Sequence, residues 1–183
     1  MGDPKKLRKK YSKPSHPWQK MRIEEERTLM NDYGLKNKKE LWKMSSTLKK
    51  YKKRVKDLVP RKDKQAELEK DQLLSKMKAM NLIKSDAILE DVLSISVKDL
   101  LERRLQTLVL KQGYASSIKQ ARQFVTHEHV TVRGKMINSP SYLVTLEEQS
   151  MINVSERVSG IKEPDEEESP KPKKEEKDGK KKK

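Results

Sequence analysis

The sequence predicts an α+β protein: a mainly helical N-terminal region with an extended basic arm, a small domain of two helices on a twisted β-sheet, and a disordered tail. Three observations predict this class. Proline and basic residues fill the first stretch, apolar residues then recur every three or four positions, and strand-like alternation begins only near residue 129. We place the arm at 1–20, the helical region at 21–98, the small domain at 99–160 and the tail at 161–183.

The composition limits what this chain can be. Only 32% of its 183 residues are hydrophobic and 39% are charged, so there is too little apolar surface to bury the whole chain. We expect a cytoplasmic protein, because no apolar run approaches the roughly 18 residues of a membrane span and no signal peptide opens the chain. The absence of cysteine excludes disulfides and thiolate zinc sites.

The net charge of +16 predicts a polyanionic partner. The basic residues are spread along the chain and are not set opposite one apolar helix face, which favours nucleic acid over a membrane surface. Residues 1–62 hold 21 Lys and Arg against 7 Asp and Glu, whereas residues 63–100 hold 6 against 8 and residues 101–160 hold 8 against 5. Binding through the first third should therefore be tight and strongly salt-dependent.

The arm combines basic, proline and aromatic residues in "MGDPKKLRKKYSKPSHPWQK". Pro4, Pro14 and Pro17 keep it extended, because proline lacks an N–H group and disfavours helix in the residue before it. Such an arm can thread between nucleic-acid helices while Tyr11 or Trp18 stacks on an exposed base. The alternative is a disordered, solubilising tail. The arm residues expected to contact nucleic acid are Lys5, Lys6, Arg8, Lys9, Lys10, Lys13, Trp18 and Lys20.

Two helices are expected after the arm. The first occupies 19–35 and ends at Gly34. The second begins at Asn37, where Glu40 three residues later predicts a capping box, and it ends at Pro60. Its apolar stripe consists of Leu41, Met44, Leu48, Tyr51, Val55 and Leu58.

Basic residues occupy much of the remaining surface of the 37–60 helix. A solvated charged face is the ordinary explanation for such a run, but the adjoining basic arm favours phosphate binding. The residues concerned are Lys43, Lys49, Lys50, Lys53, Arg54 and Lys56.

Two further segments have balanced charge, and we expect them to serve packing. A helix at 63–80 would bury Ala66, Leu73, Met77 and Met80. A short helix in "SDAILEDVLSIS" would lead into the small domain.

The small domain opens with two helices. A capping box formed by Ser96 and Asp99 begins one helix that carries Leu101, Leu105 and Leu108 and ends near residue 113. A capping box at Ser117 and Gln120 begins the next helix. This second helix turns Ile118, Ala121 and Val125 inward and sets Lys119, Arg122, Gln123 and Thr126 on the opposite face.

Short strands follow these helices. Residues 129–132 alternate as a strand, 133–134 form a two-residue turn with Gly134 in its second position, and 135–138 return antiparallel. Residues 139–144 and 150–154 are expected to add two further strands. The resulting polar face would recognise the contour of a folded RNA backbone, with Arg122 gripping phosphate through two hydrogen bonds and the helix start at Ser117 attracting an anion.

A family resemblance rests on these residues. "LERRLQTLVLKQGYASSIKQARQFVTHEHVTVRGKMINSPSY" is similar to the RNA-binding domain of the S-four family of small-subunit ribosomal proteins. "LERRLQT" and the earlier "YGLKNKKELWK" resemble the archaeal and eukaryotic branch. The two matches occur in order and together cover roughly residues 16 to 155.

The resemblance implies a function. Members of that family bind small-subunit ribosomal RNA early in assembly, near a junction in its 5′ domain. They lie by the channel through which mRNA enters, contact the neighbouring ribosomal protein S-five, and influence decoding accuracy. The RNA-contact positions carried over are Arg103, Arg104, Ser116, Ser117, Lys119, Gln120, Arg122, Gln123, His127, His129, Arg133 and Lys135, with Ser139, Ser141 and Tyr142 in the same frame.

The sequence departs from family patterns at two places. Many relatives of the domain place Asn before the hairpin glycine, where this chain has Arg133. Some bacterial members bind zinc through N-terminal cysteines, which this chain lacks.

An enzyme and a metal protein are the main alternatives. Related domains accompany RNA-modifying enzymes, and an accessory role in RNA modification or ribosome rescue is the second hypothesis. No P-loop, dinucleotide turn or activated nucleophile is present, so we expect no enzyme and no cofactor. His127 and His129 lack a carboxylate–histidine cluster, so we expect hydrogen bonding or phosphate contact and no metal.

Overall fold

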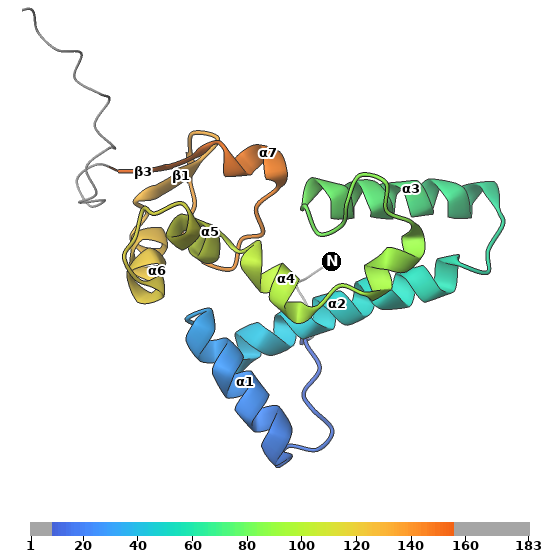
Figure 1. Ribbon diagram of the computed structural model, residues 1–183, viewed down its shortest axis with the longest axis horizontal. Coiled ribbons are helices and arrows are strands. Elements are labelled where there is room, and N and C mark those ends of the chain that lie inside the picture. The colour runs from blue at the N-terminus through green and yellow to red at the C-terminus, as the bar shows by residue number, and fades with distance from the viewer. Residues whose placement is uncertain (1–8, 156–183) are drawn as a thin grey trace, which may run out of the picture.

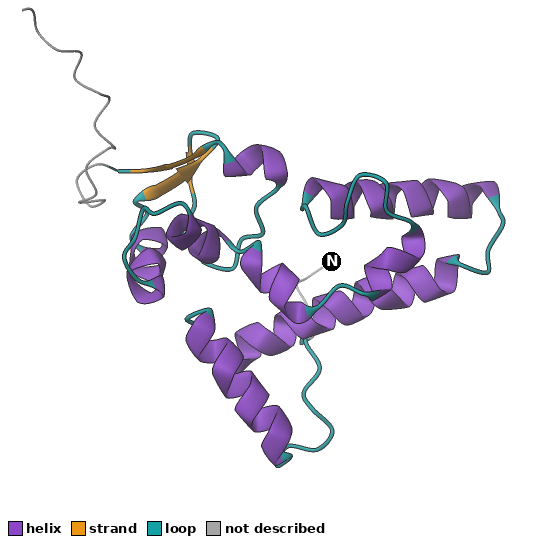
Figure 2. Cartoon of the chain, viewed as in Figure 1, coloured by secondary structure: helices purple, strands orange, loops and turns teal. Residues whose placement is uncertain are grey.

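The computed structural model describes residues 9–155, which form helices followed by a three-stranded antiparallel sheet (Figures 1 and 2). This confirms the predicted fold class. The predictions for Lys5, Lys6, Arg8 and the tail at 161–183 lie outside the described residues.

The long helix α2 (Lys38–Leu58) organises the helical region. Helix α1 (Lys20–Asp32) packs near its beginning, and α3 (Lys64–Ala79) runs alongside its second half (Figure 1). One apolar stripe on α2 serves two separate cores. Its early residues Leu41 and Met44 pack with α1, and its later residues Leu48, Val55 and Leu58 pack with α3. All three predicted helices are confirmed.

A single helix from Ser96 to Gly113 was the wrong prediction. The chain forms a short 3₁₀ helix, η1 (Leu89–Leu93), and then two helices, α4 (Val97–Glu102) and α5 (Leu105–Lys111). The break lies at Arg104, whose backbone is extended with φ −71° and ψ 142° and pairs as an isolated β-bridge with Leu143. That pairing cannot form while Arg104 continues a helix, so the helix divides there.

The break distributes neighbouring leucines among three cores. Leu100 packs with α3, Leu101 packs with α1 and the start of α2, and Leu105 packs in the compact C-terminal unit. Their spacing suits one helical face, but the structure uses them to join the helical region to the next unit.

The compact unit consists of α5, α6 (Ile118–Thr126) and a sheet of β1 (Val130–Val132), β2 (Lys135–Met136) and β3 (Ile152–Val154) in the order β2-β1-β3. Helices α5 and α6 pack against each other, as expected. Their shared core with the sheet consists of Leu105, Leu108, Val109, Ala115, Ala121, Phe124, Val125, Val130, Val132, Val144 and Ile152.

The hairpin turn between β1 and β2 has the predicted position. Arg133 and Gly134 both take positive φ, 51° and 75°, as a two-residue turn of the hairpin type requires. A strand at 139–144 was wrongly predicted: only Leu143 forms a bridge there. The short helix α7 (Leu146–Gln149) was not predicted, although Thr145 and Glu148 form the capping box that marks its start.

The other capping predictions had different outcomes. The box at Ser96 and Asp99 is confirmed. Ser117 accepts a hydrogen bond from the Gln120 backbone N–H at 3.3 Å, but the Gln120 side chain turns to the backbone N–H of Ser116 at 2.9 Å. Asn37 makes no side-chain cap, and the box predicted with Glu40 is wrong, because Glu40 binds two arginines.

Gly34, which follows α1, lies close to the compact unit. It has φ +56°, and a Cβ placed there would lie 2.8 Å from the Ile118 side chain and 2.9 Å from the Gln106 amide nitrogen. A Cβ at this position would require the Ile118 and Gln106 side chains or the backbone to shift.

Replacing Gly34 with alanine should therefore lower the free energy of unfolding by about 1–3 kcal/mol more than the same change at Gly113, because it adds an overpacking cost. Gly113 has φ +82° and nothing within 4 Å of its added Cβ, so Gly113→Ala carries the backbone strain alone. Urea unfolding of both variants measures the difference. Equal destabilisation would contradict the close approach.

Candidate nucleic-acid interface

The structure divides the predicted contact residues of the compact unit by exposure. The exposed ones lie on α6, in the loops on either side of it, in the hairpin and in the loop after the hairpin, and the buried ones lie between α4 and α5. Exposed are Ser116, Ser117, Lys119, Gln123, His127, Arg133, Lys135, Ser139 and Ser141; partly buried are Gln120, Arg122, His129 and Tyr142; buried are Arg103 and Arg104.

The loop entering α6 is held in place by its own polar groups. Gln120 Oε1 accepts hydrogen bonds from the backbone N–H and the hydroxyl of Ser116, at 2.9 and 2.5 Å. Lys119 and Gln123 stand one turn apart on the exposed face of the helix. A fixed loop and a rigid helix thus present an ammonium and an amide together, which suits recognition of a shaped backbone.

The hairpin tip is less cationic than its sequence indicates. Arg133 lies 2.9 Å from a Glu147 oxygen and 3.8 Å from Glu148. Tyr142 donates a hydrogen bond to Glu148 at 3.0 Å. Glu148 also forms the capping box of α7 together with Thr145. Burial alone would raise the pKa of Glu148, but its hydrogen bonds and the charge of Arg133 lower that pKa below its ordinary value.

The two histidines lie at the end of α6. The rings of His127 and His129 are stacked with centroids 6.4 Å apart, and His129 meets Phe124 edge-on. Between residues 9 and 155, no group of three or more potential metal ligands comes together. The stacked rings are an aromatic surface beside the exposed face of α6.

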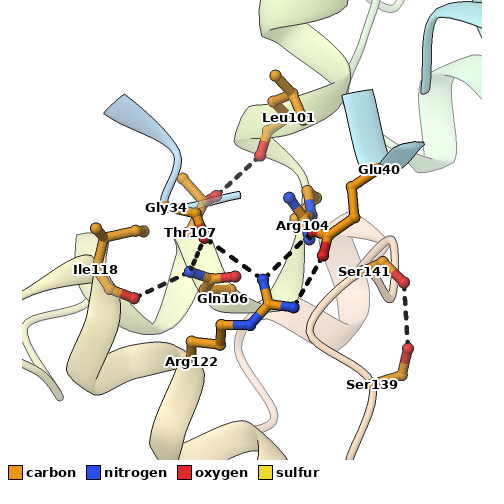
Figure 3. A network of polar contacts seen from close by, with 10 residues as sticks. All are labelled: Gly34, Glu40, Leu101, Arg104, Gln106, Thr107, Ile118, Arg122, Ser139 and Ser141. Carbon is orange, nitrogen blue, oxygen red and sulfur yellow. Dashed lines mark hydrogen bonds and ion pairs between the residues drawn. The ribbon is translucent and has the colours of Figure 1, made fainter. Parts of the chain in front are cut away.

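Glu40, at the start of α2, joins the helical region to the compact unit (Figure 3). Its two carboxylate oxygens accept hydrogen bonds from both terminal nitrogens of Arg122, at 2.9 and 3.3 Å. One of these oxygens also accepts a hydrogen bond from Arg104 at 2.9 Å. Gln106 extends this junction by donating to the backbone oxygens of Ile118 and Gly34, at 2.9 and 3.4 Å.

Arg104 needs the carboxylate of Glu40 as a counter-charge, because the Arg104 side chain is only 1% exposed. Glu40 is its only carboxylate partner within the described part of the chain, and two of its nitrogens, Nε and Nη1, have no partner there. A buried guanidinium without an anion costs several kcal/mol. Arg103 is also buried, and it donates to the Gln149 side chain at 2.8 Å and to the Val144 carbonyl at 3.1 Å.

The electrostatics of the junction follow from this geometry. Burial would raise the pKa of Glu40, but the hydrogen bonds and charges of Arg122 and Arg104 outweigh burial and lower that pKa. The folded state thus holds the ionised carboxylate more strongly than the unfolded chain does.

The basic residues of the arm and of α2 form a second exposed surface. Lys43, Lys49, Lys50, Lys53, Arg54 and Lys56 are all exposed, as are Lys9, Lys10, Lys13 and Lys20. Trp18 is 89% exposed, whereas the Tyr11 ring packs 6.1 Å from Trp42, centroid to centroid. The structure therefore brings arm lysines beside helix lysines and leaves Trp18 in solvent.

Sequence reasoning missed several residues that shape these surfaces. Trp42 and Gln106 lie within the quoted family stretches and Ser46 lies outside them, but no local pattern indicates what these residues contact, because their partners lie far along the chain. The local pattern around Glu40 indicates only a helix cap. The helix end predicted at Gly34 is correct, but no signal in the sequence indicates its close contact with Ile118.

Replacing Glu40 with glutamine should destabilise the protein by about 3 kcal/mol, because the buried Arg104 loses its counter-charge. Glu24→Gln is the matched control, because Glu24 is 63% exposed and lies 3.9 Å from Lys20 in a surface pair worth little. Thermal and urea unfolding at neutral pH compare the two variants. Equal stability would mean that Glu40 does not compensate Arg104.

The same carboxylate predicts an acid dependence. A lowered folded-state pKa contributes stability above the unfolded-state pKa, and that stability disappears as the pH falls through the folded-state pKa. The wild-type protein should therefore lose more stability than Glu40→Gln on acidification below the ordinary glutamate range. Unfolding measured across this range would show parallel curves if Glu40 were not involved.

Within residues 9–155, no helix combines the length and the apolar character needed to cross a membrane.

Residues 103–150 match the S4 domain family. A relative named small ribosomal subunit protein uS4, from Methanococcus aeolicus, is 49% identical over 154 residues, covering 84% of this chain and 87% of the relative. Relatives of the same name from Ignicoccus hospitalis and Saccharolobus solfataricus are 47% and 44% identical, covering 83% and 84% of this chain and 92% and 85% of the relatives. The chain therefore belongs to the small ribosomal subunit protein uS4 family, a family of ribosomal proteins rather than of enzymes.

Proposed function

We propose that this chain is a structural constituent of the small ribosomal subunit and binds small-subunit ribosomal RNA directly. The single observation that carries the proposal is the match to uS4 proteins over 84% of the chain, which includes both the helical region and the S4 domain. The net charge of +16 and the exposed polar face of α6 support RNA as the ligand.

The proposal assigns two roles to two surfaces. The arm and α2 supply electrostatic attraction that is independent of sequence, because their exposed residues are mostly lysines. The exposed polar residues around α6 and the hairpin select a particular RNA shape, because they sit on a packed unit with a fixed geometry. The buried Arg103 and Arg104, together with Arg122, hold that unit against the helical region.

The mechanism is to keep two RNA-binding surfaces at a fixed relative orientation. Glu40 joins them through Arg104 and Arg122, and Gly34 lets them approach closely. RNA helices held by each surface would then be held relative to one another, which would stabilise an early assembly intermediate.

The finer parts of the proposal rest on the family likeness. They are binding near a junction of the 5′ domain, a place beside the channel through which mRNA enters, contact with the S-five protein, and an influence on decoding accuracy. Cytoplasmic ribosomes are the proposed location.

Lys119→Ala combined with Gln123→Ala should reduce the preference for a 5′-domain ribosomal RNA transcript over an RNA duplex of equal length by about tenfold. Lys78→Ala with Gln72→Ala removes the same residue types from the exposed surface of α3 and serves as control. Filter binding at fixed salt measures both affinities. Equal effects of the two double variants would contradict selection by α6.

Removal of residues 1–20 should weaken binding to the transcript and to the duplex alike, because the arm binds mainly phosphates, which both RNAs carry. The slope of log affinity against log salt should become shallower by about one for each phosphate that the arm no longer neutralises. A salt titration checks this. A truncated chain without the preference for the transcript but with an unchanged salt slope would reverse the proposed roles.

A further inference from the structure

The arm and α2 line a common hollow of about 400 Å³ that is open to solvent. Five lysines line it: Lys9 and Lys10 from the arm, and Lys49, Lys50 and Lys53 from α2. Among the described residues that line the hollow, none carries a carboxylate. Two segments that are separate in the sequence therefore present their ammonium groups to one volume.

Two contacts hold the arm against the helix. The backbone N–H of Ser12 donates a hydrogen bond to Ser46 Oγ at 3.0 Å, and the two hydroxyl oxygens lie 3.3 Å apart. The neighbouring ring of Tyr11 packs on Trp42, with centroids 6.1 Å apart and planes inclined by 31°. Ser46 is only 7% exposed, so its hydroxyl is a buried polar group whose partner is the arm. The partly buried Tyr11 ring thus packs against α2.

Within residues 9–155, no carboxylate compensates the charge in this hollow. In the described part of the chain, none of the five lysines lies within ion-pair distance of a carboxylate. Lys49 and Lys53 are also one helical turn apart, where like charges repel. Holding the arm in place increases this repulsion, so the arrangement favours an anionic ligand.

We propose that the arm and α2 form one preorganised site for a cluster of RNA backbone phosphates, such as occurs where two strands run close together. This inference rests on the proposed function and makes it more specific. One phosphodiester carries a single charge, whereas five lysines surround the hollow, so several phosphates are needed to neutralise it. Because the arm is already in place, binding does not have to order it, and that saving increases affinity.

A pair of double variants tests the location of the site. Lys49→Ala with Lys53→Ala removes two lysines that line the hollow, whereas Lys43→Ala with Lys56→Ala removes two exposed lysines of the same helix that do not. The first pair should weaken binding of a 5′-domain ribosomal RNA transcript by about tenfold more and reduce the salt slope by about two. Equal weakening would mean that α2 contributes only general charge, and would overturn the proposal.

A second pair tests the preorganised arm without changing any charge. Ser46→Ala removes the acceptor of the Ser12 N–H, and Ser45→Ala alters the neighbouring, partly buried serine, which makes no side-chain hydrogen bond within residues 9–155. Ser46→Ala should weaken transcript binding by about two- to tenfold, the range contributed by one hydrogen bond, and Ser45→Ala should not. If both variants bound like the wild type, the arm would not need to be held.

A disulfide between the arm and α2 provides the complementary test, because it holds the arm in place covalently. The chain contains no cysteine, so Ser12→Cys with Ser46→Cys can form only one intramolecular bridge. The oxidised variant should bind at least as tightly as the wild type, and the reduced variant should bind as weakly as Ser46→Ala. If the oxidised variant bound the transcript more weakly than the wild type, the proposal would be overturned. A wild-type chain that does not prefer ribosomal RNA over duplex would instead overturn the proposed function, so the two failures are distinguishable.

Discussion

A carboxylate shared between two arginines determines how the halves of this chain are arranged. Glu40 comes from the start of α2, Arg104 from the start of α5 and Arg122 from the middle of α6. Buried ion pairs of this kind add little net stability compared with apolar packing, but they are costly to break and they have one geometry. Their contribution is therefore orientation. The close approach at Gly34 adds to it, because Ile118 and Gln106 pack directly against this glycine.

The fixed orientation places two differently charged surfaces in a constant position relative to each other. Most of the net positive charge lies in residues 1–62, where the arm and α2 carry exposed lysines, whereas the S4 domain presents a mixed polar surface. Either surface alone would be an incomplete recognition device: lysines attract any phosphate backbone, and a small polar face binds weakly. Under the proposed function, the two surfaces held together would require an RNA whose helices have the matching spacing.

The sequence predicted those features that depend on local periodicity. The stripe from Leu41 to Leu58 predicts α2, and the hairpin glycine predicts the turn at Gly134. The break at Arg104 could not be predicted, because Leu101, Leu105 and Leu108 fit one helical face and the interruption is imposed by a bridge to the distant Leu143. Glu40 illustrates the same limit, since a local capping signature was overridden by partners in another part of the fold.

In the candidate site, too, the features set by local sequence pattern could be predicted and those set by distant partners could not. Exposure of the helix lysines and of Lys119 could be predicted from the amphipathic pattern, whereas the burial of Arg103 and Arg104 could not, because charged residues are usually found at the surface. The pairing of Tyr11 with Trp42 could be found only in the structure, because nothing in the sequence of either segment identifies the other.

The contacts that hold the arm also differ from the Glu40 junction in the length of chain that they close. Ser12 and Ser46 are 34 residues apart, whereas Glu40 and Arg122 are 82 apart. Shorter loops close at a smaller entropic cost and, in general, sooner during folding. Every described residue that lines the lysine hollow precedes residue 54, so this part of the hollow belongs to the first third of the polypeptide. If the proposed phosphate site is correct, it would form while the S4 domain, the part proposed to discriminate between RNA shapes, is still unfolded.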